Sequence, residues 1–159
     1  LLSINLGEVE IMEPFSDVQK NEISKILKVF GFELIDDKKS KTIDKIKTVI
    51  IDLVQNKNND LKINLSNYLS QELHQDYNTL SNLFSEVENT TIEKYFINQK
   101  IEKVKELIMY DELSLSEIAY SLNYSTVSHL SNQFKKVTGF SPTYFKNLKT
   151  IKRKQIEDL

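Results

Sequence analysis

The chain has 159 residues with an ordinary globular composition, 40% hydrophobic and 28% charged, and a formal net charge of −2. No apolar run approaches the roughly 20 residues of a membrane span and no signal-peptide pattern is present, so a soluble, cytoplasmic protein is expected. Cysteine is absent, the two histidines are far apart and glycine occurs only at positions 7, 31 and 139, so no metal site, cofactor, phosphate-binding loop or enzyme is indicated.

Residues 1–37 are predicted to form a small α+β subdomain. The alternation over residues 3–12, interrupted at Leu6-Gly7-Glu8, favours two strands joined by a hairpin. Ser16-Asp17-Val18-Gln19 has capping-box spacing and opens a helix that Gly31 would end. Residues 32–35 are then predicted to form a short strand. A fragment this small buries too little surface to stand alone, so it must pack on the rest of the chain, a second copy or another segment.

Residues 38–159 are expected to be helical, starting with a helix over 40–54 and a polar loop over 55–60. Leu80-Ser81-Asn82-Leu83-Phe84 then reappears 50 residues later as Leu130-Ser131-Asn132-Gln133-Phe134. A short helix before a second helix, duplicated at this spacing, is typical of two helix-turn-helix units. The duplication predicts such units over about 64–88 and 114–138, and it indicates binding to double-stranded DNA.

The second copy is locally the clearer one. Ser114 and Glu117 have capping-box spacing at the start of a short helix, and Asn123 tolerates the left-handed backbone of a tight turn. Ser125 is placed to cap the next helix, which Gly139 would end. Its buried side would consist of Val127, Leu130, Phe134 and Val137. Its outer face would carry Ser128, Ser131, Asn132, Lys135 and Lys136, which can read base edges or neutralise phosphate.

The first copy has the same order of helices as the second but different outward-facing residues. Its turn, His74-Gln75, is one residue shorter, and Asp76 is the expected cap of its second helix. The outward residues are Asn78, Ser81, Asn82 and Ser85, none of them basic. From Leu61 to Leu122 five lysines stand against ten carboxylates, whereas from Asn123 onward six lysines and one arginine stand against two. Non-specific phosphate binding should therefore be dominated by the C-terminal unit.

A linker helix is predicted between the copies, over about 90–110. Thr90-Thr91-Ile92-Glu93 has capping-box spacing, and apolar residues follow at helical intervals. About 20 residues at 1.5 Å each give a rod of roughly 30 Å. Successive major grooves on one face of DNA are about 34 Å apart, so this helix could hold two recognition helices near that separation.

These segments resemble AraC/XylS-type transcriptional regulators. The resemblance rests on NYSTVSHLSNQFKKVTGFSPTYFK at residues 123–146 and KYFINQKIEKVKELI at residues 94–108, and it covers about residues 40–148. It implies a double helix-turn-helix domain that binds promoters in a sequence-specific way, with both recognition helices in successive major grooves. The implied DNA contacts are Asn78, Ser81 and Asn82 in the first unit, and Val127, Ser128, Ser131, Asn132, Lys135 and Lys136 in the second. Many members of that family have Arg or Lys where Asn82 and Asn132 stand, which weakens the expected guanine readout, and Gly where Asn89 stands.

The order strand, strand, helix, strand in residues 1–37 is similar to part of a ferredoxin-like unit, and resembles the heavy-metal-associated domains that precede some AraC-type regulators. Two other functions therefore stay open. The N-terminal part could belong to a metal- or ligand-sensing switch whose sensor lies largely outside this chain. Alternatively, the acidic first unit could contact a protein such as RNA polymerase instead of DNA. A homodimer is also left open.

Overall fold

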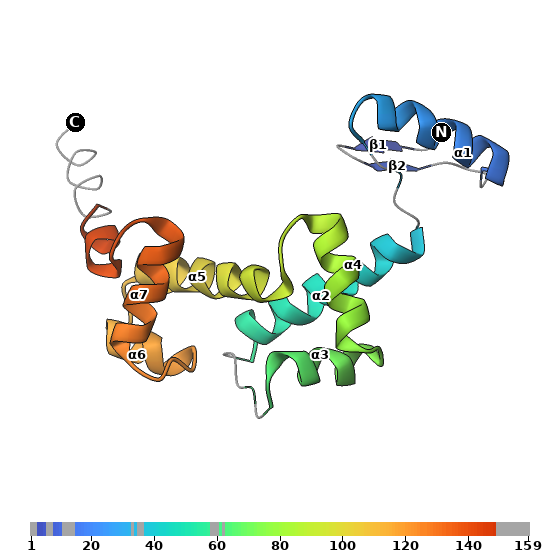
Figure 1. The fold of residues 1–159 in the computed structure, drawn as a ribbon. Coiled ribbons are helices and arrows are strands. Elements are labelled where there is room, and N and C mark those ends of the chain that lie inside the picture. Colours follow the sequence, from blue (N-terminus) through green and yellow to red (C-terminus); the bar gives the residue numbers. More distant parts are fainter. Residues whose placement is uncertain are drawn as a thin grey trace, which may run out of the picture. The chain divides into compact units, whose positions relative to one another are not determined.

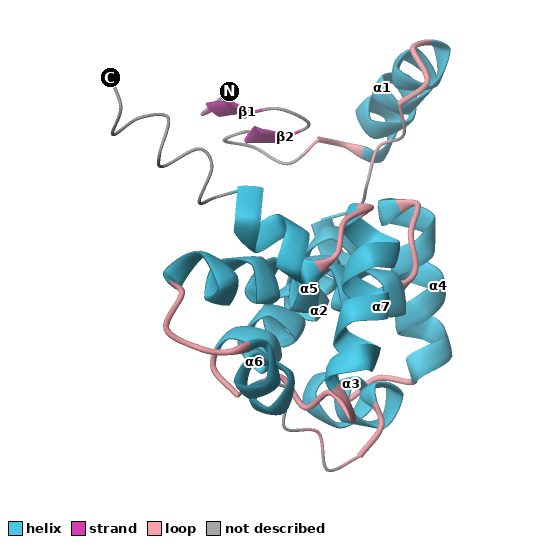
Figure 2. Cartoon of the chain, turned by 90° about the vertical axis from the view of Figure 1, so that its left-hand side faces the viewer, coloured by secondary structure: helices cyan, strands magenta, loops and turns pink. Residues whose placement is uncertain are grey.

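The computed structural model describes residues 3–5, 8–10, 15–32, 34, 37–57, 61 and 63–148. It divides into two compact units, Leu1–Asp37 and Lys38–Leu159. The fold is mostly α, as predicted, and the helices are joined mainly by short turns (Figure 2). Within the described ranges, every helix is too short or too polar to cross a lipid bilayer.

The N-terminal unit contains a hairpin and a helix. Strand β1 (Ser3–Asn5) pairs antiparallel with β2 (Glu8–Glu10), which confirms the predicted hairpin, although Glu8 lies in the strand and not in the turn. Helix α1 (Asp17–Val29) begins at the predicted capping box, because the Ser16 hydroxyl accepts the Gln19 backbone N–H at 3.3 Å. Gly31, at φ 79°, follows the end of the helix as predicted.

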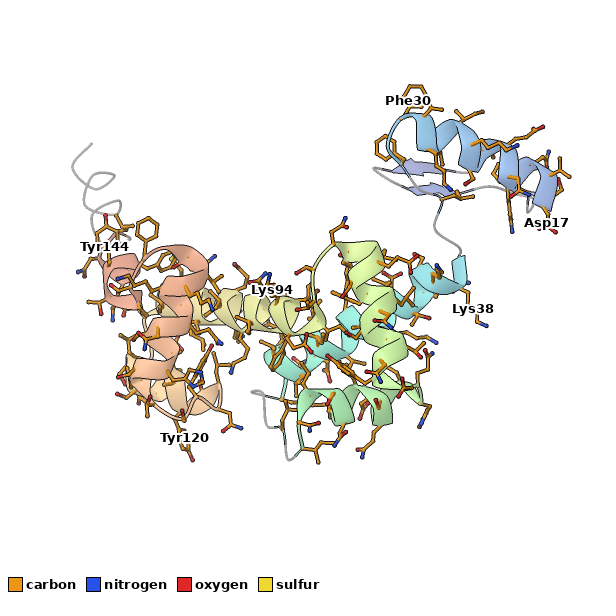
Figure 3. All side chains as sticks on the ribbon, viewed as in Figure 1. Asp17, Phe30, Lys38, Lys94, Tyr120 and Tyr144 are labelled. Carbon is orange, nitrogen blue, oxygen red and sulfur yellow. The ribbon has the colours of Figure 1, made fainter. Side chains whose placement is uncertain are left out.

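The predicted strand over residues 32–35 is wrong for the residues that can be described, because Phe32 and Leu34 lie outside any strand. The physical reason is local: the Phe32 backbone N–H donates to the Leu27 carbonyl at 2.9 Å and so helps to close the end of α1. A hairpin and one helix do not support the predicted ferredoxin-like fragment. Val18 of α1 is 69% exposed, and Phe30, the residue that follows the helix, is 72% exposed (Figure 3).

From Lys38 onward the helices form two similar halves. The first half contains α2 (Asp37–Gln55), α3 (Leu65–Leu73) and α4 (Tyr77–Glu88). The second contains α5 (Ile92–Tyr110), α6 (Leu115–Ser121), α7 (Val127–Thr138) and a helical segment over residues 142–148. Helices α3 and α4 lie at one end of α5, and α6 and α7 lie at the other (Figure 1).

Each half has its own hydrophobic core, and α5 contributes to both. The first core consists of Ile43, Ile46 and Ile50 from α2 with Leu69, Leu80, Phe84 and Ile92. The second consists of Ile101, Val104 and Ile108 from α5 with Ile118, Ala119, Leu122, Tyr124, Leu130 and Phe134. The three core positions of α2 and of α5 have the same spacing, so α5 has in the second half the place that α2 has in the first.

The repeat continues into the helix that follows each helix-turn-helix unit. Phe84 packs against Tyr95 with ring centroids 5.5 Å apart, and 50 residues later Phe134 packs against Phe145 at 5.6 Å. Ile92 and Pro142, at the starts of these helices, are both buried. The sequence duplication is therefore a structural duplication in which α4 and α7 are each fixed by the same kind of aromatic pair.

Two of the helix caps are those the sequence predicts. Asp76 caps α4 by accepting the Thr79 backbone N–H at 3.2 Å. Ser114 and Glu117 form the expected capping box at the start of α6, with the Ser114 backbone N–H donating to the Glu117 carboxylate at 2.7 Å. These hydrogen bonds lower the pKa of Glu117. Local chemistry thus decides where both helices begin.

Two other caps are shifted by one residue from the prediction. Thr91, not Thr90, caps α5 by accepting the Lys94 backbone N–H at 3.1 Å, so the predicted capping box with Glu93 is not formed. Thr126, not Ser125, caps α7 by accepting the His129 backbone N–H at 3.0 Å. The reason is that the turn before α7 extends through Ser125, whose hydroxyl instead lies 3.2 Å from the His129 ring nitrogen Nδ1.

The turns between paired helices differ as predicted. Left-handed residues stand at His74, with φ 52°, and Asn123, with φ 57°. The cap of the next helix follows two residues after His74 and three residues after Asn123, so the first turn is the shorter one. The prediction that Val137 is buried is wrong. It is 40% exposed because it lies on the last turn of α7, beyond Phe134, the last buried residue of that helix.

Helix α4 ends at Asn89 in the left-handed conformation, with φ 53°, where α7 ends at Gly139, with φ 81°. A side chain at such a φ costs free energy that glycine avoids, although asparagine tolerates it better than most residues.

We expect Asn89→Gly to raise the free energy of unfolding by about 0.5–1 kcal/mol, measured by urea denaturation. Asn98→Gly, the same change inside α5, should lower it. A decrease of stability in Asn89→Gly would mean that this side chain contributes more than its backbone strain costs.

Lys100 of α5 is the buried charged residue of the described chain, at 7% exposure. Its ammonium lies 3.7 Å from the centre of the Tyr124 ring, and burial lowers its pKa from 10.5 to about 8. Between these two values the unfolded chain binds a proton that the folded chain does not, so the free energy of unfolding should rise with pH.

We therefore expect wild-type stability to increase from pH 8 toward pH 10 relative to Lys100→Met, by up to about 3 kcal/mol. Urea unfolding at intervals from pH 6 to pH 10 measures this difference. Lys94→Met removes an exposed ammonium from the same helix (Figure 3) and should follow the wild-type profile. A constant difference between wild type and Lys100→Met across the whole range would contradict the burial of a charged lysine.

Candidate nucleic-acid interface

The predicted DNA contacts all lie on α4 and α7, the second helices of the two helix-turn-helix units. Six of them are exposed: Asn78, Asn82, Ser128, Asn132, Lys135 and Lys136. Three are half-buried: Ser81, Ser131 and Val127. Val127 packs partly against the second core, which suits its place as the first residue of α7.

Helical geometry sets the direction of the two asparagines. Leu130 and Phe134 are fully buried, and Asn132 lies midway between them in sequence. At about 100° per residue, the Asn132 side chain therefore projects roughly 160–200° away from both. The same relation holds for Asn82, midway between the buried Leu80 and Phe84. Each asparagine thus lies on the side of its helix opposite the core.

The exposed faces of α4 and α7 differ in charge because of residues at equivalent places. Glu86 of α4 corresponds to Lys136 of α7, and it forms an ion pair with Lys39 of α2 at 3.1 Å. Glu88, two residues on, pairs with Lys47 of α2 at 2.7 Å. Within the described part of the chain, Lys135 and Lys136 are in no ion pair. Lys39 and Lys47 of α2 therefore neutralise acids of α4, whereas Lys135 and Lys136 of α7 are exposed to solvent.

The helix starts carry a further electrostatic difference. The first turn of a helix presents backbone N–H groups and a partial positive charge, which favour a phosphate. Asp76 places a carboxylate at the start of α4, while α7 begins at the neutral Thr126. The start of α7 is thus a more favourable place for an anion than the start of α4, whereas Lys135 and Lys136 lie in the last turn of α7.

Tyr77 is a candidate that the sequence reasoning missed. It is the first residue of α4 and corresponds to Val127, so the 50-residue offset could have identified it. Its hydroxyl donates a short hydrogen bond to the Glu93 carboxylate of α5. Burial raises the pKa of Tyr77, and the same hydrogen bond lowers the pKa of Glu93. The start of α4 is therefore attached to the start of α5.

His129 of α7 contacts the turn that precedes the helix. Its ring meets the Tyr124 ring edge-on with centroids 5.4 Å apart, and its Nδ1 lies 3.2 Å from the Ser125 hydroxyl. The ring is thus oriented by the turn before α7. Over the residues whose placement is described, no group of three or more histidines or carboxylates has the arrangement of a metal site.

The comparisons with known proteins agree with this geometry. A family model described as a helix-turn-helix domain matches residues 69–147. Over these residues the chain has an AraC-type helix-turn-helix domain. A search of curated proteins gives no match.

Solved structures resemble the AraC-type domain over most of their length. The C-terminal domain of AraT, a response regulator from Geobacillus stearothermophilus, is 22% identical with a TM-score of 0.58, covering 67% of this chain and 84% of that one. The C-terminal domain of the two-component response regulator yesN from Fusobacterium nucleatum is 25% identical with a TM-score of 0.54. The likeness covers 64% of this chain and 98% of that one. A DNA-binding transcriptional dual regulator from Escherichia coli K-12 is 22% identical with a TM-score of 0.54. The likeness covers 64% of this chain and 89% of that one. These likenesses show that the domain has the fold of these structures.

The charge asymmetry of the AraC-type domain leads to a prediction about salt. Replacing both Lys135 and Lys136 by Ala should weaken binding to a random duplex and reduce the slope of log affinity against log salt by about 0.9 for each phosphate that is no longer neutralised. Fluorescence anisotropy at several salt concentrations measures this slope. Lys25→Ala with Lys28→Ala removes two exposed positive charges from α1 and should leave it unchanged. Equal slopes for the wild type and the α7 variant would remove these lysines from the interface.

Proposed function

We propose that this protein is a sequence-specific regulator of bacterial promoters, acting in the cytoplasm, that inserts α4 and α7 into successive major grooves. The observation that carries the proposal is the duplicated reading face. Asn82 and Asn132 occupy equivalent exposed places on two helices that share α5. A solvated helix surface has no need to repeat the same side chain at the same position of a second unit.

The length of α5 supports engagement of two grooves. Its 19 residues correspond to about 28 Å at 1.5 Å per residue. The first core is attached to its N-terminal half and the second to its C-terminal half. Successive major grooves are about 34 Å apart, so one chain supplies two reading helices at a comparable interval.

The charges of the two units indicate different contributions to DNA binding. Lys135, Lys136 and the neutral cap Thr126 favour phosphate contacts at α7. Asp76 and the paired acids of α4 offer little electrostatic affinity. We therefore propose that α7 supplies most of the non-specific affinity, and that α4 adds sequence information through Asn78, Ser81 and Asn82.

Contact of the first unit with a protein partner such as RNA polymerase is the second candidate function. It is favoured by the acidic residues of the first unit, although Glu86 and Glu88 are already paired within the chain. Footprint length on DNA separates the two functions. Two engaged units protect two successive major grooves, whereas one engaged unit protects about half of that length.

The proposed function is tested by selecting bound sites from a random double-stranded DNA library and then changing the readers. Asparagine can contact adenine in a bidentate way, worth about 1–3 kcal/mol of discrimination. Asn132→Ala should therefore relax preference at one operator position with an unchanged thermal melt. Asn82→Ala should do the same, more weakly, in the other half-site. The measurement is affinity for a panel of single-base substitutions of the selected site.

Asn98→Ala is the matched control, because Asn98 is an exposed asparagine on α5. It should retain the base preference of the wild type at every position. If Asn132→Ala also retains that preference, or unfolds the domain, Asn132 is not a reader. If the wild type selects no recurrent sequence at all, sequence-specific binding itself is rejected.

A further inference from the structure

Lys100 lies where the two halves of the domain meet along α5. Its ammonium is 3.7 Å from the centre of the Tyr124 ring, in the second core, and 5.8 Å from the centre of the Phe96 ring. Phe96 packs against the first core. A buried charge is costly unless it is compensated, and within the described part of the chain the two aromatic rings are the partners of this ammonium. Lys100 thus joins aromatic groups that belong to different cores.

Tyr124, the residue that Lys100 contacts, in turn contacts α7. It lies in the turn between α6 and α7, is 7% exposed, and donates a hydrogen bond from its hydroxyl to the Gln133 side-chain oxygen at 2.7 Å. The edge-on contact with His129 adds a second point of attachment. His129 and Gln133 are four residues apart and therefore lie on the same side of α7. Tyr124 holds the helix at two successive turns.

These attachment points and the reading face lie on different sides of the same helix. At about 100° per residue, the Ser128, Asn132 and Lys135 side chains are roughly 80–140° around the axis from the mean direction of His129 and Gln133. A rotation of α7 that follows the Tyr124 ring would therefore turn the readers away from the base edges. Recognition geometry of this kind tolerates only about 10–20°.

We propose that Lys100 is a positioning residue for DNA reading, which fixes the rotation of α7 about its own axis through Tyr124 and Gln133. The inference rests on the proposed function and deepens it. It assigns to the linker helix a role in base preference at the half-site that α7 reads. The contact is specific to that unit, since α4 is attached to α5 differently, through the hydrogen bond from Tyr77 to Glu93.

The test uses the full chain and the sites that the wild type selects from the random duplex library. Lys100→Met removes the charge and keeps the length of the side chain. We expect its discrimination among single-base variants to fall by about three- to tenfold in the α7 half-site and to stay unchanged in the α4 half-site. Lys100→Arg keeps a cation that can lie over the Tyr124 ring, and should retain more of the wild-type preference than Lys100→Met. Lys94→Met, on the exposed surface of α5, should retain the wild-type preference.

Tyr124→Phe provides an independent variant in case Lys100→Met does not fold. It keeps the ring over which the ammonium lies and removes only the hydroxyl that donates to Gln133. Its discrimination should fall in the α7 half-site alone, at a temperature where the domain is folded. Wild-type discrimination in the folded variants, or an equal decrease in both half-sites, would overturn the inference while leaving the proposed function intact. Failure of the wild type to select any recurrent sequence would overturn both.

Discussion

The structure of the AraC-type domain depends on one helix being part of two hydrophobic cores. Ile92 at the start of α5 is buried in the first core, and Ile101, Val104 and Ile108 are buried in the second. Neither helix-turn-helix pair forms a core by itself, because two short helices bury too little surface: α3 and α4 pack on α2 and on the start of α5, and α6 and α7 pack on the remainder of α5. The same contacts that stabilise each pair therefore attach both recognition helices to one continuous element. Stability and the separation of the reading helices have a common physical origin.

A duplicated scaffold does not require duplicated chemistry, and here the two halves differ where they meet solvent. The buried positions repeat closely, down to the Phe84–Tyr95 and Phe134–Phe145 pairs. The exposed positions do not: acids of α4 are paired with α2, whereas α7 exposes two lysines. Packing constrains the core because any volume change is costly, while a solvated face can change charge at little cost in stability. Such a division is what the proposed function requires, in which one unit supplies affinity and the other adds sequence information.

Features set by neighbours in sequence could be predicted, and those set by distant contacts could not. The capping box at Ser114, the cap at Asp76 and the left-handed Asn123 depend on a few consecutive residues, and the sequence predicts them correctly. The shift of the α7 cap to Thr126 depends on how the preceding turn packs, and the exposure of Val137 depends on where the second core ends. The outward direction of Asn82 and Asn132 follows from helical periodicity, so most of the candidate reading face was accessible from sequence. Tyr77 could have been added by the same offset, but its link to Glu93 is a tertiary contact.

Lys100 could not have been recognised in this way, because a lysine on a helix is expected in water. Its burial costs free energy, as the lowering of its pKa to about 8 indicates, and a well-packed apolar side chain would avoid that cost. What an apolar side chain would not supply is direction. An ammonium over a ring prefers the ring face, and the ring's hydroxyl is bound to Gln133 at 2.7 Å, so the contact specifies an orientation as well as a distance. Hydrophobic contacts at the same place are not directional, so they would specify the rotation of α7 less well. A helix that reads bases needs a fixed rotation more than it needs additional stability. Lys100 over the Tyr124 ring meets that need at the point where α5 passes from one core to the other.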